Sequence, residues 1–308
     1  MNLNVSCPIC KSEKIEFQHS YKHDSVFFEG MTRQKCISCD LHFAHPMPSD
    51  SILNKYNDSY HESAHGGKER NLKLQGFFSG ISRTRIKLIN KHISLDSQKE
   101  HKLLEIGPGP GAFASIWLEQ FPKSEYFALE TDVSCHEVLQ NMNITLLEKN
   151  EIKNYTDSFD IIIMSHVLEH VTNPIKFLDP IIANLKSGGF MYIEVPCNDW
   201  KHKKTWEPHL LFFDKKPMKK LLNELNVSLL KIGYFGTTIR NSKSFFNNFL
   251  KRTRAFLYHK LNFRYYHPQR KELKKLLKTP YEVEALLPFN SHIEKRNESL
   301  WLRVIFKK

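Results

Sequence analysis

The sequence lacks a long apolar run. Its composition is 41% hydrophobic, yet no stretch reaches the ~20 apolar residues that a membrane-spanning helix needs. Its first residues also lack the apolar core of a secretory signal peptide. These absences predict a soluble, cytoplasmic protein in which cysteine thiols stay reduced. With 308 residues, the chain is long enough for one large domain or two smaller ones around a sizeable core.

Most of the chain also lacks a charge excess of either sign. Residues 1–236 carry 28 Lys and Arg against 28 Asp and Glu, whereas residues 237–308 carry 17 against 5. The formal net charge of +12 therefore comes entirely from the C-terminal segment. A generally basic protein would indicate nucleic acid binding. A neutral body with a basic segment favours a local contact instead: an anionic substrate tail, a membrane surface or a partner.

Cysteine is scarce, but four of the six cysteines form two C-x-x-C pairs. Cys7 and Cys10 make the first pair, Cys36 and Cys39 the second, and 25 residues separate the pairs. Each pair can point two thiolates at one ion, and two pairs complete the tetrahedral coordination of Zn²⁺. Four thiolates leave no open coordination position, so we expect a structural zinc ribbon over residues 1–48. Two accidental pairs or a redox motif are the alternatives.

After the ribbon, the pattern predicts a helical linker or lid over residues 49–98 and alternating strands and helices from residue 99 to 308. Apolar strands such as FDIIIMS and GGFMYIEVP alternate with amphipathic helices such as GAFASIWLEQF. This alternation is typical of an α/β fold, with a mostly parallel sheet and helices on both faces. Such sheets bind ligands at the carboxyl ends of their strands.

A glycine turn follows the first of these strands, in LLEIGPGPGAFA. Gly107, Gly109 and Gly111 stand between a strand and a helix, where backbone N–H groups can approach a ligand closely. Their spacing alone is a weak dinucleotide fingerprint. Glu105 discriminates, because a carboxylate two residues before the first glycine repels a phosphate. It suits a cationic ligand without phosphate, and S-adenosylmethionine is such a ligand.

These motifs resemble those of the class I S-adenosylmethionine-dependent methyltransferases over roughly residues 100–236. The glycine turn matches the first motif, and ALETD, SFDIIIMSHVLEHVTNP and LKSGGFMYIEVP follow in the usual order. The resemblance implies a Rossmann-like, seven-stranded sheet in which Glu130 binds both ribose hydroxyls, which suits two acceptor oxygens. It assigns the adenine contact to Glu148 or Asn150, because the aspartate common in relatives is missing there. It also places Ser165 at the cofactor.

The ribbon ahead of this domain narrows the resemblance. CPIC, KCISCDLHFAHPMP, NKYNDSYHES, SHVLEH and PHLLFFDKKPMKKLL are similar to bacterial methyltransferases of sugar and surface-polysaccharide pathways. These include sugar C-methyltransferases with an N-terminal zinc-binding domain, so a sugar or nucleotide-linked sugar is the implied acceptor. In the C-methyltransferases an acid directly precedes the second histidine. Here Pro208 separates Glu207 from His209, which favours O-methylation slightly over C-methylation and leaves N-methylation open.

The reaction asks for alignment, exclusion of water and a base. Methyl transfer is an in-line displacement, and positioning supplies much of its rate. A hydroxyl, or a carbon beside a ketone, must also lose a proton, and a histidine suits that task near neutral pH. We expect His166, after the fourth strand, or His209, after the fifth, to be the base, with Tyr60 closing the site. The alternative is that these side chains only shape the pocket or pack in the core.

A long basic segment, about residues 237–296, is inserted before the last strand. Apolar residues recur there at helical spacing, with Lys and Arg between them. We expect helices that pack on the body or on a second subunit. Contact with an anionic substrate or with a membrane surface is the alternative.

Two other functional classes compete with the sugar methyltransferase. Some RNA methyltransferases also join a zinc ribbon to this fold, and aromatic residues amid Lys and Arg can stack on bases. The neutral body weighs against RNA, and SHVL stands where an N-P-P-Y type motif would follow the fourth strand. A non-catalytic binder is the third class. The glycine turn and Glu130 argue against it.

Overall fold

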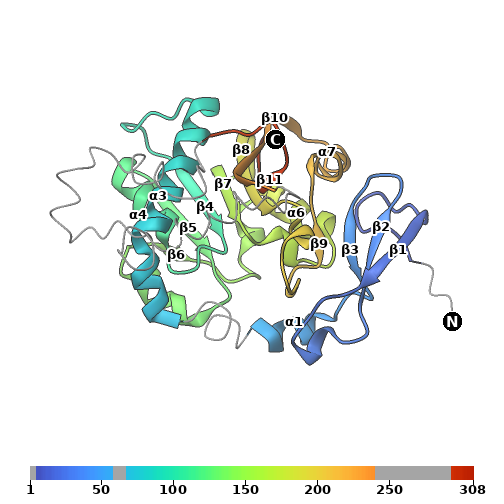
Figure 1. Ribbon diagram of the computed structural model, residues 1–308. Helices are drawn as coiled ribbons and strands as arrows, with labels where there is room; N and C mark the ends of the chain where they lie inside the picture. The colour runs from blue at the N-terminus through green and yellow to red at the C-terminus, as the bar shows by residue number, and fades with distance from the viewer. Residues whose placement is uncertain (1–4, 58–66, 240–292) are drawn as a thin grey trace, which may run out of the picture.

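The computed structural model describes residues 5–57, 67–239 and 293–308. Figure 1 shows a small sheet of N-terminal strands beside a larger sheet flanked by helices. Tyr60 and most of the expected insertion over residues 237–296 lie outside the described residues. Within the described ranges, no helix combines the length and apolar character needed to cross a membrane.

The large sheet has seven strands in the order β10-β11-β8-β7-β4-β5-β6. The pairs from β6 through β8 are parallel, and β11 runs antiparallel to both of its neighbours, β8 and β10. The predicted α/β fold with a seven-stranded sheet is therefore confirmed. The strands are β4 (Lys102–Ile106), β5 (Glu125–Leu129), β6 (Thr145–Leu146), β7 (Phe159–Ser165), β8 (Leu185–Pro196), β10 (Ser228–Thr238) and β11 (Ser299–Lys307).

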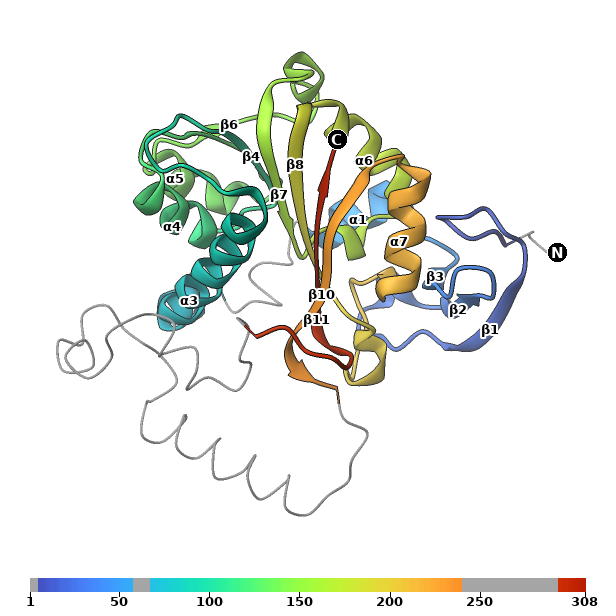
Figure 2. The same cartoon turned by 90° about the horizontal axis from the view of Figure 1, so that it is seen from above.

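Helices cover both faces of this sheet, as Figure 2 shows. Successive strand residues point to opposite faces, so Leu103 packs with Trp117 in one buried cluster, whereas Leu104 packs with Leu178 in the other. The first face carries α3 (Gly67–Ile93), α4 (Ala112–Gln120) and α5 (His136–Gln140), and the second carries α6 (Pro174–Ala183) and α7 (Lys215–Glu224).

The small sheet includes one strand from the large domain. Its N-terminal strands are β1 (Ile15–Ser20), β2 (Thr32–Cys36) and β3 (His42–His45), which pair antiparallel. The fourth strand is β9 (Leu211–Phe212), which lies between β8 and α7 in the chain and pairs with β3. One buried apolar cluster runs from the ribbon through this strand into the large sheet. The ribbon expected over residues 1–48 is therefore packed as part of a common core. The helix α1 (Asp50–Asn57) follows it.

Candidate active site

The turn after β4 is built from three glycines with left-handed backbone. Gly107, Gly109 and Gly111 have φ of +68°, +55° and +76°, which residues with a Cβ rarely adopt. A Cβ on Gly107 would lie 2.6 Å from Val167 Cγ2, and one on Gly111 would lie 2.4 Å from Met142 Cε. A Cβ on Gly109 would meet nothing within 4 Å. Two glycines thus permit close packing, and the middle one borders open space that a ligand can enter.

Glu130 lies directly beside this turn, just after β5. Its Oε2 accepts a hydrogen bond from the Gly109 N–H (2.8 Å), and its Oε1 accepts one from the Asp132 N–H (2.8 Å). The Gly107 N–H donates to the Leu129 carbonyl (2.9 Å), which ties the turn to β5. A carboxylate oxygen can accept more than one hydrogen bond. The side chain is therefore placed to receive two hydroxyls of a vicinal diol at the glycine turn.

Glu105 is buried beneath the turn and does not face the open space. It shares a strand face with Leu103, is 3% exposed, and accepts a hydrogen bond from the Tyr126 hydroxyl (2.5 Å). Burial raises its pKa to about 7, although Tyr126 and the Arg85 charge oppose the rise. Its carboxyl group is therefore only partly ionised at neutral pH. Any repulsion of phosphate acts through this buried, partial charge and not by direct contact.

The remaining residues expected at the cofactor lie at the same strand edge. Glu148 and Asn150 are both exposed in the loop after β6, and the Glu148 backbone N–H is bonded to Glu151. Ser165 ends β7, and its buried hydroxyl oxygen has no hydrogen-bond partner among the described residues. An unpaired buried hydroxyl costs free energy. The turn, Glu130 and this hydroxyl together form a donor and acceptor set that fits an adenosyl ligand.

His166 begins the loop after β7 with a left-handed φ of +57°. Its Nε2 lies 3.2 Å from Glu194 Oε1, and its Nδ1 lies 3.5 Å from Glu169 Oε1. Burial opposes a charge on the ring, but hydrogen bonds to Glu169 and Glu194 outweigh it and raise its pKa to about 9. His166 is therefore an imidazolium at neutral pH, a form that cannot accept a proton.

His209 contacts one acidic and one basic side chain, Asp199 and Lys203. It is 5% exposed, and its Nδ1 lies 2.6 Å from Asp199 Oδ2. Burial works against the charge on Asp199, but His209 and Lys203 lower its pKa well below the usual value. The ionised Asp199 is an acceptor, so Nδ1 carries the hydrogen that points to it. Lys203 Nζ lies 3.2 Å from Nε2 and 3.0 Å from Asp199 Oδ2. This arrangement can hold a neutral histidine in one tautomer.

The acid two residues before His209 contacts another part of the molecule. The Glu207 carboxylate accepts hydrogen bonds from the backbone N–H groups of Asp24 and Ser25 in the ribbon. Asp199 is the acid that pairs with His209 instead, and sequence reasoning did not identify it. Its one signal is its place at the start of the loop after β8, ten residues before the histidine.

Glu169 lies close to both His166 and His209. It is 1% exposed, and its Oε1 lies 3.5 Å from His166 Nδ1 and 3.7 Å from His170 Nε2. One potential ligand atom on each of Glu169, His170 and His209 lies within 4.8 Å of the others. Three such groups could hold an ion. However, Asp199 and Lys203 already occupy the two ring nitrogens of His209. We therefore assign this cluster to proton chemistry rather than to a metal.

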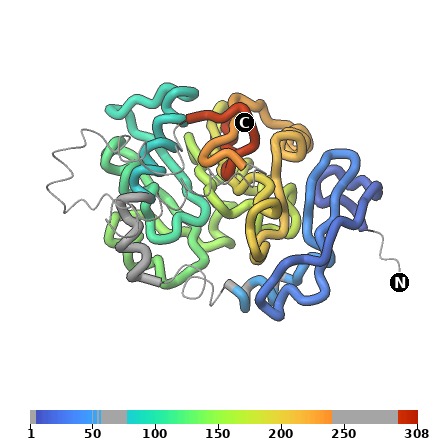
Figure 3. The backbone as a smooth tube through the Cα atoms, viewed as in Figure 1, coloured from blue at the N-terminus to red at the C-terminus, as the bar shows by residue number. Residues whose placement is uncertain are grey.

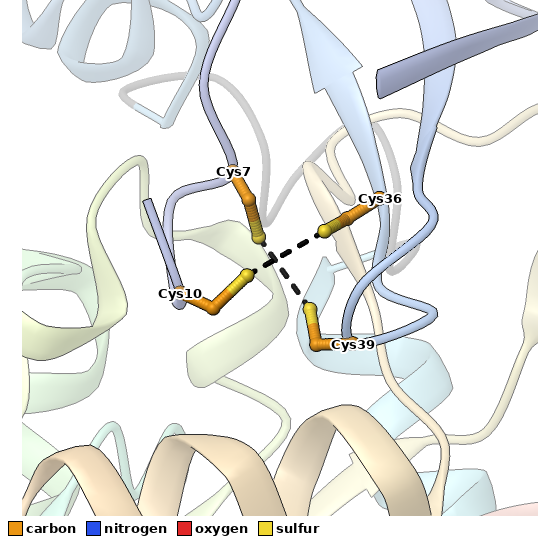
Figure 4. Close-up of side chains that lie close together, drawn as sticks. All are labelled: Cys7, Cys10, Cys36 and Cys39. Carbon is orange, nitrogen blue, oxygen red and sulfur yellow. Dashed lines mark hydrogen bonds between the residues drawn. The ribbon is translucent and has the colours of Figure 1, made fainter. Parts of the chain in front are cut away.

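The four paired cysteines converge in the ribbon, as Figure 4 shows. Sγ of Cys7 lies 3.5 Å from Sγ of Cys39, and Sγ of Cys10 lies 3.5 Å from Sγ of Cys36. All four sulfurs lie within 4.8 Å of one another. The two 3.5 Å separations are much longer than the ~2.05 Å of a disulfide bond. A tetrahedron with Zn–S bonds of about 2.3 Å has edges of about 3.8 Å. The cluster therefore fits a four-coordinate zinc ion.

Comparison with known proteins bears on the large domain. A family model described as "Methyltransferase domain" matches residues 79–232. Methyltransferase str3 of Strobilurus tenacellus is 30% identical over 125 residues, which are 40% of this chain and 44% of that protein. Release factor glutamine methyltransferase of Flavobacterium psychrophilum is 27% identical over 134 residues, 41% of this chain and 39% of that protein. The chain thus spans less than half the length of these two curated relatives.

Solved structures share the fold. Phosphoethanolamine N-methyltransferase 2 of Haemonchus contortus, solved in complex with S-adenosyl-L-methionine, superposes with a TM-score of 0.50 at 11% identity. The match covers 87% of this chain and 62% of that one. At this identity the likeness shows the Rossmann-like architecture and nothing about the substrate.

Proposed function

Because this chain belongs to the methyltransferase-domain family that its residues 79–232 match, we propose that it is an S-adenosylmethionine-dependent methyltransferase. The observation that carries the proposal is the pairing of Glu130 with the Gly109 N–H at an open left-handed turn. This arrangement sits at the carboxyl ends of β4 and β5, where parallel α/β sheets bind their ligands.

The cofactor supplies a methyl group made electrophilic by a sulfonium. We assign the ribose hydroxyls to Glu130. The Ser165 hydroxyl, which has no partner in the part of the chain that the structure describes, we assign to a polar atom of the same ligand. Glu148 or Asn150 would accept the adenine amino group from the loop after β6. The chain's part is to hold the methyl carbon in line with the acceptor and to exclude water.

His209 is the base in this proposal. Its Nδ1–H is held by Asp199, so the Nε2 lone pair can take the acceptor proton as the new bond to the methyl carbon forms and the bond to sulfur breaks. Lys203 contacts both Asp199 and Nε2, and it can keep its ion pair with Asp199 while an acceptor hydroxyl replaces it at Nε2. His166, already protonated, instead bridges the buried carboxylates of Glu169 and Glu194.

We propose a sugar or a nucleotide-linked sugar as the acceptor, with O-methylation ahead of C-methylation. The support is the run of motifs shared with sugar-pathway methyltransferases, together with the paired cysteines of the ribbon. RNA is the second candidate, because a ribbon joined to this fold also occurs among RNA methyltransferases. The balanced charge of residues 1–236 favours the sugar.

A labelling experiment separates the two acceptors. The protein is incubated with methyl-tritiated S-adenosylmethionine and, separately, a panel of nucleotide-sugars and total RNA. We expect label in a nucleotide-sugar, and we expect Asp199→Asn to slow transfer on the order of 10²–10⁴-fold with cofactor affinity unchanged. Label in RNA that declines with added salt would replace the sugar by RNA. No transfer and no cofactor binding would refute the methyltransferase itself.

A further inference from the structure

The loop that carries His209 lies between the two sheets of the molecule. It leaves β8 at Cys197, contains Asp199 and His209, forms β9, and reaches α7 at Asp214. Figure 3 shows this yellow segment running beside the blue ribbon. Through β9, the loop is hydrogen-bonded to β3, with Leu211 opposite Phe43 and Phe212 opposite His42. His209 thus lies in a loop whose strand, β9, is part of the small ribbon sheet.

Backbone groups on both sides of His209 are bonded to the ribbon. The Tyr21 hydroxyl donates to the His209 carbonyl oxygen (2.8 Å). The Trp206 N–H donates to the Lys22 carbonyl (2.7 Å), and the Ala44 N–H donates to the Leu210 carbonyl (2.8 Å). Tyr21 is 4% exposed, so its hydrogen bond is shielded from water. These contacts fix the backbone of His209 and of its immediate neighbour.

Glu207 adds a charged anchor two residues before the histidine. Its carboxylate receives the N–H groups of Asp24 (3.0 Å) and Ser25 (3.1 Å), from the stretch between β1 and β2. Hydrogen bonds to an ionised acceptor are roughly twice as strong as neutral ones. Trp206, 1% exposed, packs edge-on against Tyr21 with ring centroids 5.5 Å apart. The Glu207 hydrogen bonds and the Trp206 packing thus hold two consecutive residues of the loop against the ribbon.

The cysteine cluster fixes the ribbon end of this connection. Cys36 ends β2, and Cys39 lies in the turn that leads into β3. A bound metal would therefore clamp the β2–β3 hairpin, whose second strand holds β9. Glu130 and Gly109, by contrast, contact each other after β5 and β4, which β7 separates from β8. The cofactor half of the site is held by β4 and β5, and the acceptor half by the ribbon.

We propose that Tyr21 and Glu207 are positioning residues through which the metal-bound ribbon places His209 for proton transfer. The proposal rests on the proposed role of His209 as the base. It assigns the ribbon a part in the acceptor half of the site and none in cofactor binding. It also gives Glu207, the displaced acid of the second histidine motif, a task that does not involve contact with the acceptor.

Histidine NMR tests the proposal without requiring turnover. The full-length, zinc-loaded protein is labelled at histidine ¹³Cε1, and the His209 resonance is assigned by its loss in His209→Gln. Tyr21→Phe and Glu207→Gln each remove one polar interaction with little change in shape. Lys216→Gln is the matched control, because Lys216 pairs with Asp40 of the ribbon (2.6 Å) from α7 and not from the His209 loop.

We expect Tyr21→Phe and Glu207→Gln to shift or broaden the His209 resonance, and Lys216→Gln to leave it in place. Removal of zinc by a chelator should produce the same change in the unaltered protein. Methyl transfer should fall on the order of tenfold to a hundredfold in the two variants, with S-adenosylhomocysteine affinity unchanged. An unmoved His209 resonance in both variants and after zinc removal would overturn the proposal. A shifted resonance in a protein that fails to bind S-adenosylhomocysteine would refute the methyltransferase function alone.

Discussion

Two histidines close to Glu169 differ because of the residues that face them. His166 lies between the carboxylates of Glu169 and Glu194, whereas His209 contacts one carboxylate and one ammonium, those of Asp199 and Lys203. In sequence both are simply histidines that follow buried strands. Only the folded chain shows that one lies between two carboxylates and the other between a carboxylate and an ammonium.

The charge on His166 gives a prediction about pH. We expect His166 to titrate near pH 9 in NMR, because the carboxylates of Glu169 and Glu194 favour its charged form over the opposing effect of burial. A folded-state pKa above the unfolded value means that this stabilisation is complete below about pH 6.5. It is lost as the pH rises through about 9. Glu169→Gln should bring the titration toward lower pH, and a midpoint near 6.5 in the unaltered protein would contradict this account.

Glu105 also has a raised pKa, which gives a prediction about a substitution that stabilises the protein. Its folded-state pKa of about 7 exceeds the ordinary 4.5 because of burial, so ionisation above pH 7 opposes folding. We expect Glu105→Gln, which keeps an acceptor for Tyr126, to raise the free energy of unfolding at pH 8 by up to about 3 kcal/mol. At pH 4 the two proteins should be alike. Urea unfolding at both values measures this, and equal stability of the two proteins at pH 8 would argue against a raised pKa at Glu105.

Spacing identified some site residues and missed others for a physical reason. The cysteine pairs, the three glycines and Glu130 each belong to a short local pattern, and the structure brings each set together. Spacing missed Asp199, which pairs with His209 ten residues further along the chain. It placed Glu105 at the ligand, whereas Glu105 is buried against Tyr126 from another strand. Contacts of this kind depend on tertiary packing, so no local pattern reveals them.

At the scale of elements, the strand–turn–helix unit β4–α4 carries the three-glycine turn. Gly111 precedes α4 at φ +76°, and its missing Cβ makes room for Met142 and Leu139. Gly109 has the same handedness but borders open space. The two glycines therefore serve different ends within one turn, one for packing and one for access.

This difference predicts two distinct alanine phenotypes. Gly111→Ala should lower the free energy of unfolding by about 2–5 kcal/mol, because about 1–2 kcal/mol for the left-handed backbone adds to about 1–3 kcal/mol for overpacking against Met142 and Leu139. Gly109→Ala should cost about 1–2 kcal/mol for its left-handed backbone, and it should also weaken S-adenosylhomocysteine binding by narrowing the open space. Urea unfolding and calorimetry separate the two effects. Full affinity in a folded Gly109→Ala protein would contradict a ligand at this turn.

Long elements were predictable, and short ones were not. The strands β7 and β8 and the helix α4 follow from apolar runs and helical periodicity, and they appear where the sequence indicates them. The two-residue strand β9 has no periodicity to detect, because its pairing with β3 depends on how the ribbon docks. That strand is nevertheless the element that connects His209 to the ribbon.

At the scale of the whole molecule, the ribbon and the large sheet share one core. The buried cluster that includes Cys7 and Phe43 continues through Phe213 to Leu104 and Phe306. The seven-stranded α/β architecture and the methyltransferase family were predictable from the order of motifs. The common core was not, because each ribbon residue reads locally as part of a separate small module.

A shared core predicts that metal loss affects the stability of the whole chain. A metal at about 1,000 times its dissociation constant adds about 4 kcal/mol to the free energy of unfolding. At about 2–4 °C per kcal/mol, its removal should lower Tm on the order of 10 °C. We expect differential scanning calorimetry to show a single thermal transition both with and without the chelator. Separate melting of the ribbon, with the main transition unmoved, would show that the two units are independent.

The central claim is that the glycine turn and Glu130 bind an adenosyl ligand, and isothermal calorimetry with S-adenosylhomocysteine tests it most directly. The unaltered protein should bind one equivalent. Glu130→Ala should weaken binding on the order of tenfold to a hundredfold, because it removes hydrogen bonds from a charged acceptor. Glu137→Ala, the same change at an exposed site on α5, should leave the affinity intact. No heat of binding to the unaltered protein, or equal affinity in Glu130→Ala, would contradict the claim.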